Sequence, residues 1–124
     1  MSGHDEASAP VPLAFSPRDF APQRLDVEGE AWIQSIIGPE SSSTIGAGIG
    51  TFEDVTFEWT MEYDEVIFLS EGSVSVAHQA GSIEGKAGDL LLVPRGNRVT
   101  YHFRGKCRVL FATYPANWEE RKDG

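Results

Sequence analysis

From Ile45 onward, apolar and polar residues alternate over short stretches, as they do in β-strands with one buried face. Residues 56–63 and 97–104 alternate in this way. Residues 66–69 and 90–93 are continuously apolar, which predicts buried strands, either covered on both faces or paired inside a sandwich. Gly and Pro separate these stretches where turns are expected. Many short strands without crossover helices predict an all-β sandwich or barrel.

The rest of the chain carries weaker signals. Residues 1–12 are small, polar and proline-containing, which predicts a disordered tail followed by a single folded domain over residues 13–124. One helical turn is expected at Ser16 and Pro17, because serine can cap a helix and proline suits its first position. Residues 81–89, GSIEGKAGD, are predicted to form turns. Asn117 is expected to cap a short C-terminal helix.

Composition narrows the class of protein. The 124 residues fit one domain, and no apolar run approaches the roughly 18 residues that span a bilayer. The only cysteine, Cys107, cannot form an internal disulfide, and the acidic N-terminus has no apolar signal segment. We therefore expect a cytoplasmic protein without a membrane partner. A net charge of -9 argues against nucleic-acid binding.

Two segments carry the spacing of a known barrel motif. Six residues separate Glu65 from Gly72, and in GDLLLVPRGNRV five residues separate Gly88 from a Pro-x-Gly sequence that begins at Pro94. These segments resemble the two halves of the cupin motif, the signature of a double-stranded β-helix or jelly-roll barrel. The resemblance implies that all-β fold. It also implies a homodimer, since cupin barrels commonly pair through sheet edges.

Most metal ligands of the motif are missing. Its His-x-His pair would fall on Glu58 and Thr60, or on Trp59 and Met61, and its last histidine is replaced by Val99. Only the glutamate of the motif remains, whereas a transition-metal site normally needs three or four ligands. We therefore expect a degenerate metal site, with no built-in transition metal and a retained concave interior.

A narrower resemblance covers residues 42–119. FEWTMEYDEVIFLSEG, AGDLLLVPRGNRVTY and FATYPANWEE are similar to the cupin domain of the ethanolamine-utilisation protein Q family, whose members also lack the cupin histidines. The resemblance implies a link to ethanolamine catabolism and acetate-kinase-type chemistry, with magnesium held by substrate phosphates and one carboxylate. Family members carry an N-terminal region before the cupin. The short lead-in here suggests a free-standing relative that serves another small-molecule pathway.

Glu65 is the strongest candidate for chemistry. Its apolar sequence neighbours should raise its pKa, which suits a general acid or base, although a structural carboxyl is the alternative. Tyr63 is the second catalytic candidate, because it lies two residues away and can share the same face. Tyr101 shares a face with Val99 and is expected to line a substrate cavity.

The sequence leaves open which face of residues 56–63 points inward. Trp59 and Met61 occupy one face, and Glu58 and Thr60 occupy the other. A bulge would exchange the two faces, so all four residues are candidates for binding a small-molecule substrate.

Three functions are compatible with these residues. The first is a metal-independent or weakly metal-dependent cupin that acts on a small polar metabolite, with Glu65 as acid or base. The second is a non-catalytic metabolite-binding or scaffold module. The third is a lyase or dioxygenase whose metal is held by Glu58, Glu62 and Glu65. If the Glu65 carboxyl faces a cavity and a tyrosine hydroxyl lies within hydrogen-bonding distance, the catalytic function is favoured. Sealing by Phe68 and Leu92 favours a structural carboxyl.

Overall fold

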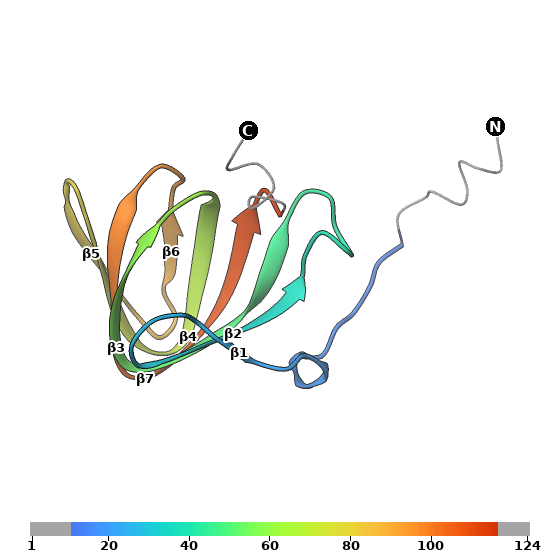
Figure 1. The fold of residues 1–124 in the computed structure, drawn as a ribbon, viewed down its shortest axis with the longest axis horizontal. Coiled ribbons are helices and arrows are strands. Elements are labelled where there is room, and N and C mark those ends of the chain that lie inside the picture. Colours follow the sequence, from blue (N-terminus) through green and yellow to red (C-terminus); the bar gives the residue numbers. More distant parts are fainter. Residues whose placement is uncertain (1–10, 117–124) are drawn as a thin grey trace.

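The computed structural model describes residues 11–116, and their regular structure is almost entirely β (Figure 1). In chain order the elements are a 3-10 helix, η1 (Pro17–Asp19), and seven strands: β1 (Gln23–Arg24), β2 (Glu30–Ile37), β3 (Gly46–Thr60), β4 (Asp64–His78), β5 (Gly81–Lys86), β6 (Leu90–Val93) and β7 (Arg98–Tyr114). Residues 1–10 of the tail predicted over residues 1–12, and the C-terminal helix predicted at Asn117, lie outside the described residues. No helix within the described range is long and apolar enough to cross a membrane.

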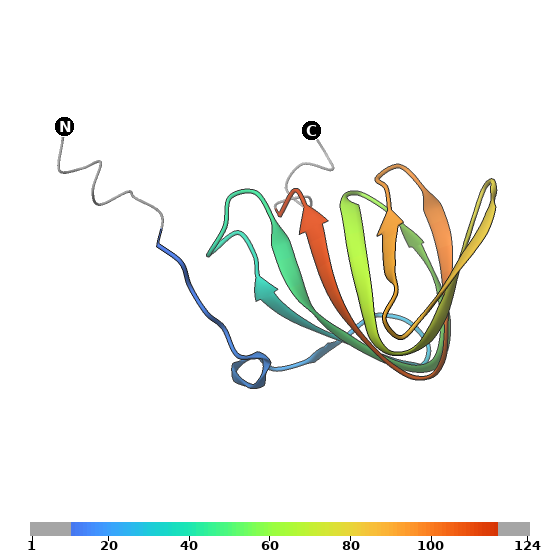
Figure 2. The same cartoon turned by 180° about the vertical axis from the view of Figure 1, so that it is seen from behind.

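All seven strands belong to one antiparallel sheet. Its order is β1–β2–β3–β7–β4–β5, and β6 pairs with the first part of β4. Figures 1 and 2 show this sheet curved around an interior, with the long strands β3, β4 and β7 bending through its base. The predicted all-β barrel is therefore confirmed.

The strands differ from prediction in extent. Residues 98–114 form one strand, β7, rather than two. The segment GSIEGK, predicted as turns, is instead strand β5, which pairs with β4 from Ser73 to His78. The strands β1 and β2 carry no clear alternation of apolar and polar residues, and the sequence did not reveal them.

The helical turn at Pro17 is confirmed as η1, with proline at its start. The side chain of Ser16 makes no capping hydrogen bond. The amide of Gln34 on β2 instead donates hydrogen bonds to the backbone oxygens of Pro17, at 2.7 Å, and Phe20, at 2.9 Å. A side chain of the sheet therefore holds this turn in place.

Inward-facing side chains of β3, β4 and β7 form the core. Its stacked rings include Phe52 and Phe103, whose centroids lie 3.9 Å apart. Further core residues from these strands are Val55, Ile67, Leu69, Val74, Val76, Tyr101, Cys107 and Val109. Cys107 is 4% exposed, and burial raises the pKa of its thiol, in accord with an inert structural cysteine.

The two continuously apolar segments are not buried on both faces in the single chain, which corrects the prediction. On β4, Ile67 and Leu69 face the core, whereas Val66 and Phe68 face outward and are exposed. On β6, Leu90 and Leu92 likewise face outward, and they are among the most exposed apolar residues of the described chain. The barrel therefore carries an apolar outer surface.

Candidate functional site

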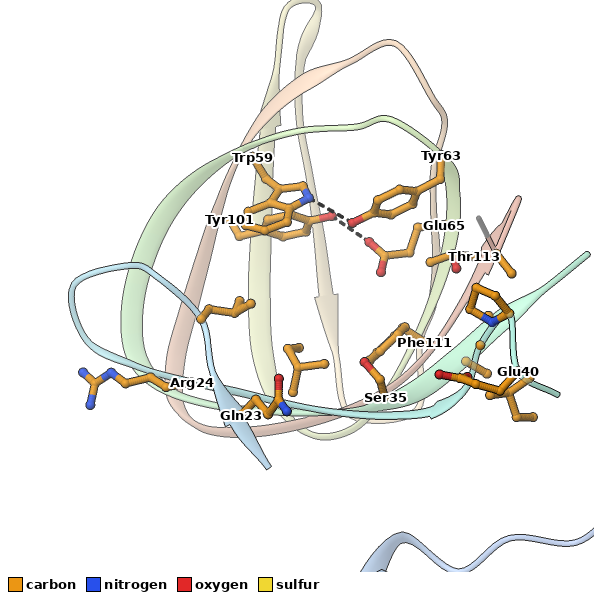
Figure 3. Close-up of a pocket in the computed structure, with 18 of the residues that line it drawn as sticks. Gln23, Arg24, Ser35, Glu40, Trp59, Tyr63, Glu65, Tyr101, Phe111 and Thr113 are labelled. Carbon is orange, nitrogen blue, oxygen red and sulfur yellow. Dashed lines mark hydrogen bonds between the residues drawn. The ribbon is translucent and has the colours of Figure 1, made fainter. Parts of the chain in front are cut away.

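A cavity of about 510 Å³ lies inside the barrel, and residues of β1 and β2 contribute to its lining (Figure 3). One end holds a cluster of aromatic side chains around the carboxyl of Glu65. The lining includes the following side chains: Gln23, Ser35, Glu40, Phe57, Trp59, Tyr63, Glu65, Tyr101, Phe111 and Thr113.

A bulge in β3 determines which face of residues 56–60 points inward. Phe52 faces the core before the bulge, and Val55 faces it afterwards, so the inward positions change from even to odd numbers. Asp54 occupies the bulge with a φ of 44°, and its carboxylate accepts a hydrogen bond of 2.7 Å from the backbone N–H of Gly105. Trp59 consequently points into the cavity.

Glu58 and Thr60 lie on the opposite, outer face of β3. Arg98 on β7 donates hydrogen bonds to both side chains, at 2.6 Å to Glu58 and 2.5 Å to Thr60. Neither residue lines the cavity, so of the two possible inward faces the structure selects the one that carries Trp59.

Glu65 and Tyr101 are joined by a hydrogen bond inside the cavity. The Tyr101 hydroxyl donates to Oε1 of Glu65 over 3.1 Å. Burial raises the pKa of Glu65 from its usual 4.5 to about 7, and the hydrogen bond from Tyr101 opposes part of that rise. Burial, reinforced by the charge of Glu65, also raises the pKa of Tyr101, so its phenol remains protonated. Glu65 is therefore the group that can gain or lose a proton near neutral pH.

Tyr63 and Met61 each contact another member of the aromatic cluster. The indole N–H of Trp59 donates a 2.9 Å hydrogen bond to the Tyr63 hydroxyl. The thioether sulfur of Met61 lies 3.7 Å from the Tyr101 hydroxyl, and Met61 is buried behind the lining rather than part of it. Of the predicted site residues, the structure thus brings together Glu65, Tyr63, Tyr101 and Trp59.

Glu65 faces the cavity rather than the outer face of the sheet. Its carboxyl group lines the cavity and accepts a hydrogen bond from the Tyr101 hydroxyl. Phe68 and Leu92 lie on the outer face and do not seal it. The Glu65 carboxyl therefore faces the cavity and is not enclosed by these two side chains.

The donor set does not fit a resident metal ion. Within residues 11–116, no three His, Cys, Asp or Glu side chains form a group that can hold one. Glu58, one ligand of the predicted carboxylate site, is paired with Arg98 outside the barrel, and Glu62 does not line the cavity. The hypothesis of a metal held by Glu58, Glu62 and Glu65 is therefore wrong for this geometry.

Several lining residues were not anticipated from the sequence. Phe57 alternates with Trp59 on the same face of β3, so the pattern contained its signal. Phe111 and Thr113 come from the end of β7, and Gln23 and Ser35 come from β1 and β2. These four reach the cavity only through long-range strand pairing, which no local pattern reveals.

Known proteins support this architecture. The cupin domain of Schizosaccharomyces pombe Cnp3 superimposes with a TM-score of 0.68 over 90% of this chain and 80% of that chain. Its identity of 14% bears on the fold alone. The predicted cupin jelly roll is confirmed by this likeness and by the antiparallel sheet.

Closer relatives share a single description. The protein named acetate kinase EutQ of Escherichia coli K12 is 29% identical over 87 residues, which cover 70% of this chain and 37% of that protein. The crystal structure of ethanolamine utilisation protein Q of Salmonella typhimurium LT2 has a TM-score of 0.72 and 28% identity, and the match covers 77% of this chain and 79% of that chain. The family model described as ethanolamine utilisation protein EutQ matches residues 23–120, and the chain therefore belongs to the EutQ family.

Proposed function

We propose that the cavity binds a small polar metabolite and that Glu65 exchanges a proton with it. One observation carries this proposal: the Glu65 carboxyl faces the cavity, where burial raises its pKa to about 7. A carboxyl with such a pKa populates both protonation states near neutral pH, as a general acid or base requires. The non-catalytic alternative, a binding or scaffold module, would use the same cavity without the proton transfer.

The neighbouring residues supply positioning. The hydrogen bond from Tyr101 engages one carboxyl oxygen of Glu65, and Figure 3 shows the other pointing towards the interior. The indole of Trp59 is fixed by its hydrogen bond to Tyr63, so this wall is ordered before a ligand arrives. The apolar rings would pack against the carbon part of a metabolite and reduce its contact with water.

Phosphoryl transfer is less well supported by these residues. The relatives named acetate kinase extend well beyond the matched region, since this chain covers 37% of the Escherichia coli protein. Transfer of a phosphoryl group requires cations or a metal around the phosphates. The described lining contains one basic residue, Arg24, to meet those phosphates. We therefore do not extend that activity to this chain.

The test is a ligand screen with matched variants. Melting temperatures of the wild type would be measured with ethanolamine, acetate, acetyl phosphate and a panel of neutral, cationic and anionic metabolites. A true ligand should stabilise the wild type, and it should shift the ¹³C carboxyl signal of Glu65. The effect should be lost in Glu65→Gln and kept in Glu58→Gln, which changes a carboxyl outside the cavity. If no compound both raises the melting temperature and moves the Glu65 signal, the proposal is wrong.

A further inference from the structure

The charged groups of the cavity are predominantly acidic. Both Glu65 and Glu40 belong to the lining, and Figure 3 shows them at separate places in it. Arg24 is the only basic residue of the described lining, and Figure 3 shows its guanidinium pointing away from Glu65. A ligand inside the barrel would therefore meet carboxyl groups and no inward-pointing cation from the described residues.

Arg24 is also committed to other partners. One guanidinium nitrogen donates a 2.6 Å hydrogen bond to the backbone oxygen of Gly29, and another lies 3.8 Å from the carboxylate of Glu30. The guanidinium is 5.7 Å from the ring centroid of Trp32, which is outside the cavity. Turning Arg24 inward to bind an anion would break all three interactions.

The aromatic lining is suited to a cation. Phe57, Trp59, Tyr63, Tyr101 and Phe111 all contribute to it. The rings of Phe57 and Tyr101 are 5.5 Å apart between centroids, and Trp59 meets Phe57 edge-on at 6.2 Å. Faces of aromatic rings carry partial negative charge and attract organic cations within about 6 Å. The cavity thus combines ring faces with a carboxyl group.

Among the residues that the structure describes, the groups around Glu65 supply no positive charge. Tyr101 from β7 donates the hydrogen bond already described, and Tyr63 precedes β4 on the same lining. The register partners of Glu65 are Thr113 on β7 and Val93 on β6. These neighbours are polar or apolar but uncharged at neutral pH, so an ionised Glu65 lacks a counter-ion within the described lining.

We propose that the ligand of this cavity is a small organic ammonium ion, whose charged group lies between the Glu65 carboxylate and the faces of the neighbouring aromatic rings. This inference rests on the proposed function, because it assigns a charge class to the same metabolite. An anion would be repelled by ionised Glu65, and a neutral alcohol would leave that carboxylate without a counter-charge.

The direction in which binding affinity changes with pH distinguishes an ammonium ion from an anion. An ammonium ion requires ionised Glu65, so its affinity should rise with pH and level off above pH 7. Below pH 6 it should fall by about tenfold per pH unit, the limit for binding linked to the loss of one proton. An anion would show the opposite trend, because it requires the protonated carboxyl.

Three probes of similar size test the inference. They are 2-aminoethanol (the ethanolamine of the screen above) as the cation, ethane-1,2-diol as the neutral compound and glycolate as the anion. Each would be titrated into the full chain between pH 5.5 and 8, with the ¹³C carboxyl signal of Glu65 as readout. We expect 2-aminoethanol to bind at least about tenfold more tightly than the diol at pH 8, a difference of about 1.4 kcal/mol. Glu65→Gln should abolish both this preference and the pH dependence, whereas Glu58→Gln should keep both.

The outcomes separate the two proposals. If the diol or glycolate binds as well as 2-aminoethanol and moves the Glu65 signal, the ammonium assignment is overturned and the metabolite site stands. If none of the three probes moves that signal, the ammonium assignment is also overturned, and the wider screen above decides the metabolite site. Tight binding of 2-aminoethanol that survives in Glu65→Gln places the cation elsewhere and overturns the assignment as well.

Discussion

The Tyr101 hydroxyl reaches the carboxyl of Glu65 over 3.1 Å, although the strand register does not pair these two residues. Tyr101 pairs with Val76 at the far end of β4, whereas Glu65 pairs with Thr113. Their contact therefore crosses the barrel interior and depends on the curvature of the whole sheet. It also links the two opposing influences on Glu65, because burial raises its pKa and this hydrogen bond lowers it.

Tyr101→Phe should raise the pKa of Glu65 above its wild-type value. The substitution removes the hydrogen bond that stabilises the carboxylate and leaves the burial of the carboxyl in place. The ¹³C carboxyl shift of Glu65, followed from pH 4 to 9, measures this value directly. Thr60→Val on the outer face is the matched control and should leave the titration unchanged. A fall in the Glu65 pKa of Tyr101→Phe would contradict the proposed balance of burial and hydrogen bonding.

Glu65→Gln should stabilise the protein at pH 8 but not at pH 4. The folded-state pKa of about 7 lies above the usual 4.5, so the folded protein binds the proton more tightly than the unfolded chain. Stability conferred by protonated Glu65 is therefore complete below pH 4.5, declines between pH 4.5 and 7, and is lost above that range. At 1.36 kcal/mol per pKa unit, the difference amounts to about 3 kcal/mol.

Urea denaturation of the wild type and Glu65→Gln at both pH values measures this effect. Glu58→Gln controls for the loss of one negative charge, since Glu58 lies exposed beside Arg98 and contributes little. Equal pH dependence in the wild type and Glu65→Gln would show that burial of Glu65 does not destabilise the ionised state.

The barrel and its central carboxyl could be predicted from sequence because their signals are local. Alternation marks the strands, and motif spacing identifies Glu65. The inward position of Trp59 could not be predicted, because it depends on the register shift at Asp54, which moves every later side chain of β3 to the other face. Ser35 was out of reach for a different reason: β2 has no clear alternation, and its place in the cavity follows from pairing with β3.

Gly72→Ala should destabilise the protein more than Gly96→Ala. Both glycines belong to the cupin spacing and have similar positive φ values, 90° and 95°, so alanine is strained at either position. A Cβ at Gly72 would lie 2.6 Å from the backbone oxygen of Lys106 and would collide with the thiol of Cys107. A Cβ at Gly96 meets no described atom within 4 Å.

We expect a loss of about 1–2 kcal/mol for Gly96→Ala, from backbone strain alone. Gly72→Ala should lose at least about 3 kcal/mol, because the clash with the backbone of β7 adds to that strain. Chemical denaturation measures both values. Equal losses in the two variants would show that the close approach of β4 and β7 at Gly72 is not a constraint.

The outward-facing apolar residues of β6, β4 and β7 form one continuous surface. Leu90 pairs with Phe68, which pairs with Leu110, and in the next row Leu92 pairs with Val66. These five residues define the outer apolar patch, and three of them are more than half exposed: Leu90, Leu92 and Leu110. None carries charge, although the chain has a net charge of -9. Two copies of so acidic a chain would repel one another least where their contact is free of charge.

We therefore expect a homodimer in which the outer apolar patches of two copies face each other. This contact uses a face of the sheet, whereas the sequence analysis expected pairing through sheet edges. It would also bury the outward-facing apolar residues of segments 66–69 and 90–93, which were predicted to be buried. Light scattering after size exclusion, at micromolar concentration, should give a dimer mass for the wild type. The double variant Leu90→Ser, Leu92→Ser should weaken dimerisation by at least about tenfold, whereas Val11→Ser should not. Val11 is 71% exposed. It belongs to residues 11–16, a segment that leads away from the sheet (Figure 1). A wild-type monomer, or a dimer that the double variant leaves intact, would rule out this interface.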